Sequence, residues 1–213
     1  MLINRPESIP KERLSKIEYF ENDIPELEAA FREIVSRETY ARKNKRSICA
    51  DFATLDTETT SVARQTLWNN TDTDIGFIYL VQLHIAGKNF IFRTIYDFKD
   101  AIEKVAIPLL NETESCIVIY IHNLSFEFQF FKSVIPMESV FALKNRRIAK
   151  ALAYDGAIEF RCSYLLSNMS LEKFTENYND EKYRKDKELI DYEIKRYPWT
   201  ILTDEILYYS LMD

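Results

Sequence analysis

A continuous apolar run in the middle of the chain, Cys116-Ile-Val-Ile-Tyr-Ile-His122, constrains the fold most strongly. An unbroken apolar strand is typical of a strand that is covered on both faces of its sheet. A polar Asn123 follows immediately, and the sequence then becomes helical. The run therefore predicts a central strand that ends at a helix start, as in α/β domains.

Periodic patterns surround this strand. Two strand-like runs separated only by Ala-Gly-Lys indicate a hairpin, and the helix after it has Asp97 as its expected N-cap. The expected strands are 47–56, 75–85, 89–94, 116–122 and two or three between 139 and 162, and the expected helices are 24–46, 97–110, 123–134, 170–177 and one starting at Thr203. The order of hairpin, helix, strand and helix predicts a mixed central sheet flanked by helices.

The first forty-six residues precede these patterns. Pro6 and Pro10 lie in a loosely ordered lead-in, and apolar residues then recur at helical spacing up to a basic end near Arg46. We expect residues 1–46 to form this lead-in and an amphipathic helix, and residues 47–213 to form the main domain. The simplest interpretation of the helix is a packing appendage.

The amino-acid composition argues against several kinds of catalytic site. The chain has three cysteines, two histidines and three glycines, with no CxxC and no glycine-rich phosphate loop. The cysteines lie in apolar stretches, which predicts buried thiols. With two histidines and three separated cysteines, the chain has too few suitable side chains for a zinc site or a Ser-His-Asp triad. Any enzymatic chemistry must therefore come from carboxylates.

The charge of the chain leaves its partners open. The formal charge is −6 and the pI is about 5.2, which disfavours nucleic acid, but 42–46 and 144–150 are basic clusters. Such clusters occur as solvated faces or as phosphate contacts. With no apolar run of about 18 residues and no secretory signal at the start, we expect no membrane association and a cytoplasmic protein.

Carboxylates at recurring spacings suggest metal-dependent phosphodiester hydrolysis. Asp56-Thr-Glu58 closes a β-prone run and matches D-x-E, in which both side chains point to one side. Tyr209-x-x-x-Asp213 places a phenol and a carboxylate on one helix face. Each pattern also occurs elsewhere in the chain, as at Asp191-Tyr-Glu193, so neither is specific alone. Three or four such carboxylates can hold two ions about 4 Å apart.

The segment between these two patterns is the most informative. The apolar strand runs into Asn123-Leu-Ser-Phe126-Glu127, a polar residue followed by an aromatic and an acid at a helix start. A purely structural interpretation is available, with Asn123 as helix cap, Phe126 in the core and Glu127 as a favourable first-turn charge. The segment alone does not decide between structure and function.

Together these motifs resemble the 3′–5′ exonuclease domain of family B DNA polymerases. Asp56-Thr-Glu58-Thr59 looks like its first motif, D-x-E-T, and Asn123-x-x-Phe126-Glu127 like its second, N-x-x-F-D. Tyr209-x-x-x-Asp213 looks like the third, Y-x-x-x-D. Lys187-Glu-Leu-Ile-Asp191-Tyr192 and Ser163-Tyr-Leu-Leu are similar to two further motifs of the protein-primed phage and plasmid branch.

The resemblance implies a ribonuclease-H-like α/β fold and a two-metal proofreading exonuclease that trims single-stranded DNA. It implies Mg²⁺ or Mn²⁺ as two ions, a polymerase domain and a terminal protein primer as partners, and a phage- or plasmid-encoded protein in a bacterial cytoplasm. Implied metal ligands are Asp56, Glu58, Glu127 and Asp213, further catalytic residues are Tyr209 and Lys187, and implied DNA contacts are Thr59, Asn123, Phe126, Ser163 and Tyr192.

Three departures leave alternatives open. Glu127 stands where the second motif has Asp, the chain stops at Asp213, and no polymerase half follows. Asp72-Thr-Asp74 superficially resembles the polymerase metal motif, but its position favours a turn. A catalytically weak or inactive module that holds single-stranded DNA, or a polymerase remnant, is therefore the second hypothesis. An exonuclease of the same fold that acts on RNA is the third.

Overall fold

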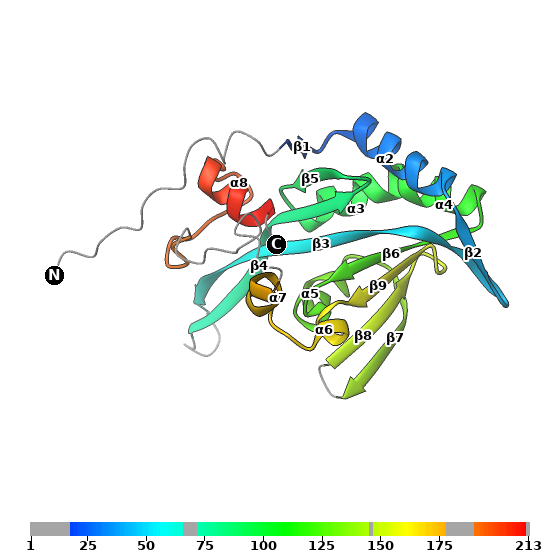
Figure 1. The fold of residues 1–213 in the computed structure, drawn as a ribbon. Helices are drawn as coiled ribbons and strands as arrows, with labels where there is room; N and C mark the ends of the chain where they lie inside the picture. The colour runs from blue at the N-terminus through cyan, green and yellow to red at the C-terminus, as the bar shows by residue number, and fades with distance from the viewer. Residues whose placement is uncertain (1–17, 66–71, 145–146, 178–189, 212–213) are drawn as a thin grey trace.

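The computed structural model describes residues 18–65, 72–144, 147–177 and 190–211, which form one sheet with helices packed against it (Figure 1). The strands are β1 (Phe20–Glu21), β2 (Thr39–Arg42), β3 (Lys45–Gln65), β4 (Asp72–Ile85), β5 (Lys88–Phe92), β6 (Ser115–Ile121), β7 (Met137–Lys144), β8 (Arg147–Ala153) and β9 (Ile158–Cys162). The helices are α2 (Ile24–Ser36), α3 (Ile95–Lys104), α4 (Ala106–Glu112), α5 (Leu124–Phe131), α6 (Tyr164–Ser167), α7 (Leu171–Asn177) and α8 (Asp204–Leu211).

The sheet has the order β1-β5-β4-β3-β6-β9-β8-β7, with β2 beside β3. β4 is antiparallel to both of its neighbours, β3 and β5, whereas β6 and β9 run parallel to β3. Three antiparallel strands followed by two parallel ones, in the order β5-β4-β3-β6-β9, give the mixed sheet of a ribonuclease-H-like fold. The predicted fold class is confirmed.

One large apolar core lies between the sheet and helices α2 to α5. Phe31 of α2, Phe98 of α3 and Phe131 of α5 are fully buried in it, and Phe160 of β9 packs on Phe131 with ring centroids 5.8 Å apart. A second, smaller cluster forms on the opposite face, where Leu207 of α8 packs against β4 and β5. Helices therefore lie on both faces of the sheet. α2 to α5 cover the first face, and α8 packs on the opposite face at β4 and β5.

The N-terminal helix is shorter than the sequence predicted. α2 ends at Ser36, and the β-prone Thr39 and Tyr40 enter β2, which turns back at Asn44 with φ of 55° and pairs with β3. The predicted basic helix end is thus a hairpin, so that expectation was wrong. The proposed boundary after residue 46 falls inside β3, and α2 packs in the main core.

Two other boundaries differ from expectation. The helix predicted over 97–110 is interrupted at Val105, and Thr94, not Asp97, is its N-cap, since the Asp97 backbone N–H donates to Thr94 Oγ1 at 3.0 Å. Asp72-Thr-Asp74, interpreted as a turn, begins β4. The remainder of the predicted turn, residues 69–71, lies outside the described residues, as does the whole of the charged segment 179–188.

Several other expected elements are confirmed. The hairpin of β4 and β5, the central strand β6, the helix after Asn123, the three strands between 137 and 162 and the last helix are all present. The Ile206 backbone N–H donates to Thr203 Oγ1 at 3.4 Å, as expected of an N-cap. The three cysteines are buried free thiols. None of the helices among the described residues is both long and apolar enough to cross a bilayer.

The aromatic contact that holds α5 on the sheet provides a stability test. Phe160→Ala would leave a cavity under α5 and lower the free energy of unfolding by about 3–5 kcal/mol, whereas the conservative Phe160→Leu would lower it by less than about 1.5 kcal/mol. Phe141→Ala, at a side chain on β7 that is 55% exposed, is the matched control. Urea unfolding measures all three, and equal losses for Phe160→Ala and Phe141→Ala would contradict the packing described here.

Candidate active site at the carboxyl edge of the parallel strands

Three of the predicted residues meet at one edge of the sheet. In the sheet, Thr54 of β3 pairs with Tyr120 of β6, and Tyr120 pairs with Arg161 of β9. Asp56 lies two residues beyond Thr54 on β3. Asn123 and Ser163 follow the ends of β6 and β9 in the same way, because parallel neighbours end at the same side of a sheet. This edge of the sheet therefore brings together Asp56, Asn123 and Ser163, which belong to three different predicted motifs.

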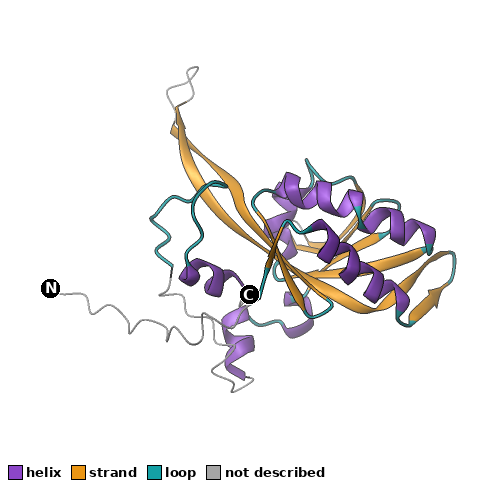
Figure 2. Cartoon of the chain, turned by 90° about the horizontal axis from the view of Figure 1, so that it is seen from above, coloured by secondary structure: helices purple, strands orange, loops and turns teal. Residues whose placement is uncertain are grey.

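Asp56 and Glu58 lie within β3 rather than at its end. β3 continues to Gln65 in a long ribbon with β4, which projects away from the helices (Figure 2). Two residues apart on a strand, the two carboxylates point to the same face. Glu58 is 8% exposed, and a register irregularity follows it at Thr59. The predicted strand end at Asp56 was wrong, but the predicted common orientation of the pair agrees with the extended backbone.

The surroundings of Glu58 are partly aromatic. Burial raises the pKa of Tyr79 to about 12, and the negative charge of Glu58 adds to the rise. Arg196, 8% exposed, acts in the opposite direction on the same phenol. Its guanidinium donates to the backbone oxygen of Asp191 at 2.9 Å. Glu58 therefore sits beside a phenol that stays protonated, with a buried cation fixed nearby by backbone carbonyls.

Glu127 is a buried acid of the predicted site. It lies in the first turn of α5, 4% exposed, on the same buried face as Leu124 and Phe131. Burial raises its pKa to about 8. Among the described residues, its Oε2 atom has no hydrogen-bond partner. A buried carboxyl oxygen without a donor is a suitable ligand for a hard cation, which would stabilise the charged form.

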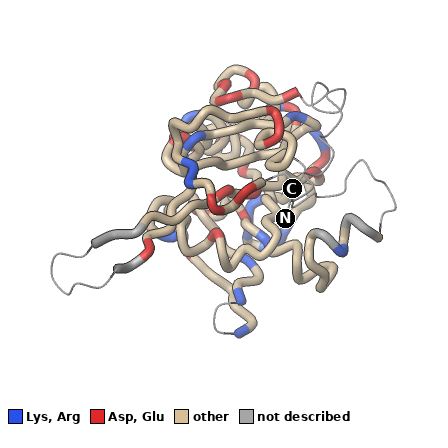
Figure 3. Tube along the Cα trace, turned by 90° about the vertical axis from the view of Figure 1, so that its left-hand side faces the viewer, with Lys and Arg blue, Asp and Glu red and all other residues tan. Residues whose placement is uncertain are grey.

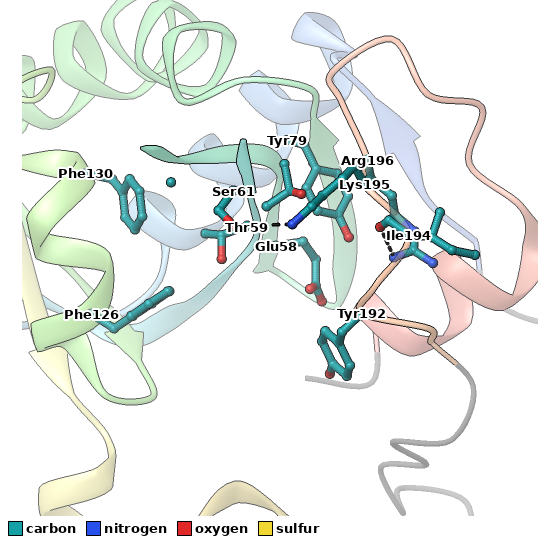
Figure 4. A pocket seen from close by; sticks show the side chains of 12 residues that line it. Glu58, Thr59, Ser61, Tyr79, Phe126, Phe130, Tyr192, Ile194, Lys195 and Arg196 are labelled. Carbon is teal, nitrogen blue, oxygen red and sulfur yellow. Dashed lines mark hydrogen bonds between the residues drawn. The ribbon is translucent and has the colours of Figure 1, made fainter. Parts of the chain in front are cut away.

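A pocket of about 310 Å³ brings several motif residues together (Figure 4). Thr59, Phe126 and Tyr192, all predicted DNA contacts, line it together with Glu58. Phe126 and Phe130 of α5 form one side, with ring centroids 5.6 Å apart. The segment before α8 forms the other side, and β3 and β4 form the floor. Sequence reasoning missed Phe130, Lys195 and Arg196, although the Phe126–Phe130 spacing of one helical turn was a usable signal.

Tyr209 joins this region from α8. It is 3% exposed, and its hydroxyl shares a hydrogen bond with the hydroxyl of Tyr192, which is 60% exposed. The structure thus links a predicted catalytic phenol to a side chain that lines the pocket. Lys187 and Asp213 lie outside the described residues, so the roles expected of them stay predictions.

Asn123 and Ser163 lie beside a second pocket of about 500 Å³. Asn123 adopts a left-handed backbone with φ of 64°, and its side chain makes no capping hydrogen bond to α5. Ser163 Oγ lies 3.3 Å from His122 Nδ1, and His122, Arg147 and Tyr164 also line this pocket. The expected DNA contacts are therefore divided between two pockets, both of which include residues at or near the start of α5.

The possible metal ligands are all oxygen atoms. Among residues that the structure describes, no group of three or more His, Cys, Asp or Glu side chains lies close enough together to hold an ion. Asp213, the fourth expected ligand, is outside that part of the chain. The chemistry of the donors suits Mg²⁺ or Mn²⁺, and the unpartnered oxygen of Glu127 fits such an ion.

Comparison with known proteins gives a distant structural likeness. No protein-family model and no curated protein matches the sequence. The chain is similar to the crystal structure of the catalytic core of RRP6 from Trypanosoma brucei and to that of its cysteine-to-serine mutant, each at 14% identity, with TM-scores of 0.46 and 0.47. The likeness covers 96% of this chain and 48–49% of those chains, so this chain spans about half their length. We therefore base its function on its own residues.

The buried Glu127 predicts a pH-dependent stability in the metal-free protein. Between about pH 4.5 and about 8 the unfolded chain has released the Glu127 proton and the folded protein keeps it. The free energy of unfolding should therefore fall as the pH rises through this window, by at most about 1.4 kcal/mol per pH unit. Urea unfolding with a chelator at several pH values measures it.

The uncharged Glu127→Gln should remove this component of the pH dependence. Glu112→Gln, at an exposed position of α4, is the matched control and should leave it intact. Parallel pH curves for the unmodified protein and Glu127→Gln would show that Glu127 is ionised in the folded protein.

Proposed function

We propose that this chain is the 3′–5′ exonuclease domain of a protein-primed family B DNA polymerase, which removes 3′-terminal nucleotides from single-stranded DNA. The observation that carries the proposal is the pocket in which Glu58, Thr59, Phe126 and Tyr192 meet. These residues come from three motifs separated by more than sixty positions each. A shared pocket is what a common substrate requires of them, and the strand order agrees with a nuclease fold.

The aromatic side chains give the pocket its affinity for a single strand. Phe126 is 41% exposed and Tyr192 60%, on opposite sides of the pocket. Exposed rings that face a shared space can stack on unpaired bases whatever their sequence. Thr59 and Ser61 on the floor supply hydroxyl groups, and Lys195 Nζ, 3.4 Å from Ser61 Oγ, supplies a positive charge for a phosphate.

The acidic residues supply the chemistry. Asp56, Glu58, Glu127 and Asp213 would hold two divalent ions, which activate a water molecule and stabilise the leaving 3′ oxygen when bound. Tyr209 would orient the attacking water through its hydroxyl, held by Tyr192. Lys187 would neutralise the charge that develops on the scissile phosphate. Burial raises the pKa of Glu127 to about 8. At neutral pH Glu127 would therefore become a charged metal ligand only with a cation beside it.

A second candidate, a binding module that holds single-stranded DNA without hydrolysing it, is favoured by the same Glu127. Its longer side chain and raised pKa both oppose a tightly positioned, charged ligand at neutral pH. Action on RNA is the third candidate, because stacking of bases on Phe126 and Tyr192 would not distinguish RNA from DNA.

Substitution of the carboxylates separates the enzyme from the binding module. The double change Asp56→Asn and Glu58→Gln keeps the side-chain volumes and should abolish mononucleotide release from a 5′-labelled single strand with Mg²⁺ or Mn²⁺. Binding of the same strand should persist, because affinity comes mainly from phosphate and stacking contacts. Asp100→Asn on α3, a side chain that is 79% exposed, is the matched control.

An unmodified protein that releases no mononucleotide with either ion, yet binds the strand, would favour the module. Matched DNA and RNA strands in the same assay distinguish the substrate. Release from RNA alone would contradict the DNA assignment.

The stacking role predicts a separate effect of Phe126. Phe126→Ala should weaken single-strand binding by about 1–3 kcal/mol, because a base loses its aromatic platform. Tyr96→Ala on α3, an aromatic that is 63% exposed and lies outside the pocket, should leave binding unchanged. Fluorescence anisotropy measures both. Equal affinities of the Phe126→Ala and Tyr96→Ala proteins would remove Phe126 from the binding surface.

A further inference from the structure

The sheet face that carries Asp56 continues away from the active-site edge over β3, β6, β9 and β8. α8 packs on this face at β4 and β5. Over the other four strands several side chains keep contact with solvent: Phe52 is 57% exposed, and the side chains of Lys150 and Arg161 are 41% and 33% exposed. We call the part that these side chains occupy the open face.

Strand register arranges the open face in rows. Thr54, Tyr120, Arg161 and Lys150 are successive register partners across β3, β6, β9 and β8. A second row, one step further from the edge, contains Phe52, Val118, Glu159 and Leu152. Each row spans three strand spacings, about 14 Å, and Phe52 lies about 13 Å along β3 from Asp56. The first row adjoins the edge where Asp56, Asn123 and Ser163 lie.

The open face has a surplus of positive charge. Glu159 is 2% exposed and is surrounded by three cations, with Arg161 at 2.8 Å, Arg42 at 3.0 Å and Lys150 at 3.8 Å. Burial raises the pKa of Glu159, but its hydrogen bonds to Arg161 and Arg42 outweigh this, so its pKa is lowered and it stays charged. One carboxylate and three cations leave two positive charges on a protein whose formal charge is −6.

Aromatic rings lie beside these cations. Phe52 and Tyr120 contact each other edge to face, with ring centroids 5.3 Å apart. Tyr120 also interacts with Arg161 through a side-chain hydrogen bond. An exposed ring next to surplus positive charge is the combination that binds single strands, since bases stack on rings and phosphates approach the cations. An ion network that served only to neutralise Glu159 would need neither the exposed Phe52 nor the third, more distant Lys150.

We propose that the open face binds the stretch of single-stranded DNA that lies 5′ of the terminal nucleotides held at the carboxylate edge. The proposal rests on the proposed function, since it takes the strand end to lie near Asp56. The strand would run along the rows from this edge, with phosphates at Lys150 and Arg161 and a base against Phe52. Binding would then depend on strand length, because a short oligonucleotide would fill the edge and leave the open face empty.

The experiment compares binding of about 12 nucleotides with binding of about four, by fluorescence anisotropy with a chelator present to prevent hydrolysis. Lys150→Gln combined with Phe52→Ala should weaken binding of the longer strand about 10-fold and leave the shorter one unchanged. Lys150→Gln alone should reduce the salt dependence of the longer strand by about 0.7 in the logarithmic slope, and Lys150→Arg should retain it. Arg42 and Arg161 stay in place, so the nearest partners of Glu159 are preserved.

The matched control combines Lys104→Gln with Tyr96→Ala, one exposed cation and one exposed aromatic on α3. Urea unfolding confirms that each variant is folded. Equal loss for both strand lengths, unchanged binding of the longer strand, or no binding of either strand by the unmodified protein would overturn the proposal. Failure of the proposed hydrolysis is distinguishable, because it would appear as absent nucleotide release while the length-dependent loss persists.

Discussion

The unequal pairing of β3 with its two neighbours is the constraint on which the site depends. On one side β3 pairs with β4 from Thr54 to Gln65, but on the other its pairing with β6 ends at Thr54. Among the described residues, β3 is therefore paired on only one side from Asp56 onward. The chain leaves β6 at Asn123 and turns into α5, and the pocket opens between α5 and the continuing ribbon. Carboxylates at positions 56 and 58 thus lie where the sheet divides, at a place that a substrate can reach.

The division also explains which parts of the structure the sequence could predict. The order of elements followed from local patterns, since apolar runs and caps such as Thr203 act within a few residues. The end of β3 did not follow from local patterns. Asp56 and Glu58 suggested the end of a strand, whereas pairing with β4 extends the strand to Gln65. The basic segment after α2 was misassigned for a similar reason: helical spacing up to Val35 did not reveal that Thr39 would pair with Cys49. Long-range pairing decides both cases.

The candidate site shows the same limit. Motif order predicted that residues from distant segments share a surface, and Thr59, Phe126 and Tyr192 do line one pocket. Motifs do not reveal the residues between them, so Phe130 and Arg196 were missed. Glu127 shows why burial matters as well as position: a first-turn acid is favourable on an exposed helix, but under Leu124 and Phe131 its desolvation keeps a proton on it. The sequence motif identified Glu127 as a candidate ligand, but its burial in the fold determines its protonation.

The distribution of charge on the folded protein resolves the conflict between its acidity and a polyanionic ligand. Basic and acidic residues are spread over the described part of the chain (Figure 3), and the formal charge of −6 describes the sum over the sequence rather than any one surface. At the edge, carboxylates are the groups that cations would neutralise. Next to it, register places Arg161 and Lys150 side by side on β9 and β8, with Arg42 close to Glu159. Phosphates interact mainly with charges within about a Debye length, roughly 10 Å, so a strand on the open face would interact mainly with this local surplus. An acidic protein can therefore hold a nucleic acid strand, provided that the strand meets the cations before the carboxylates.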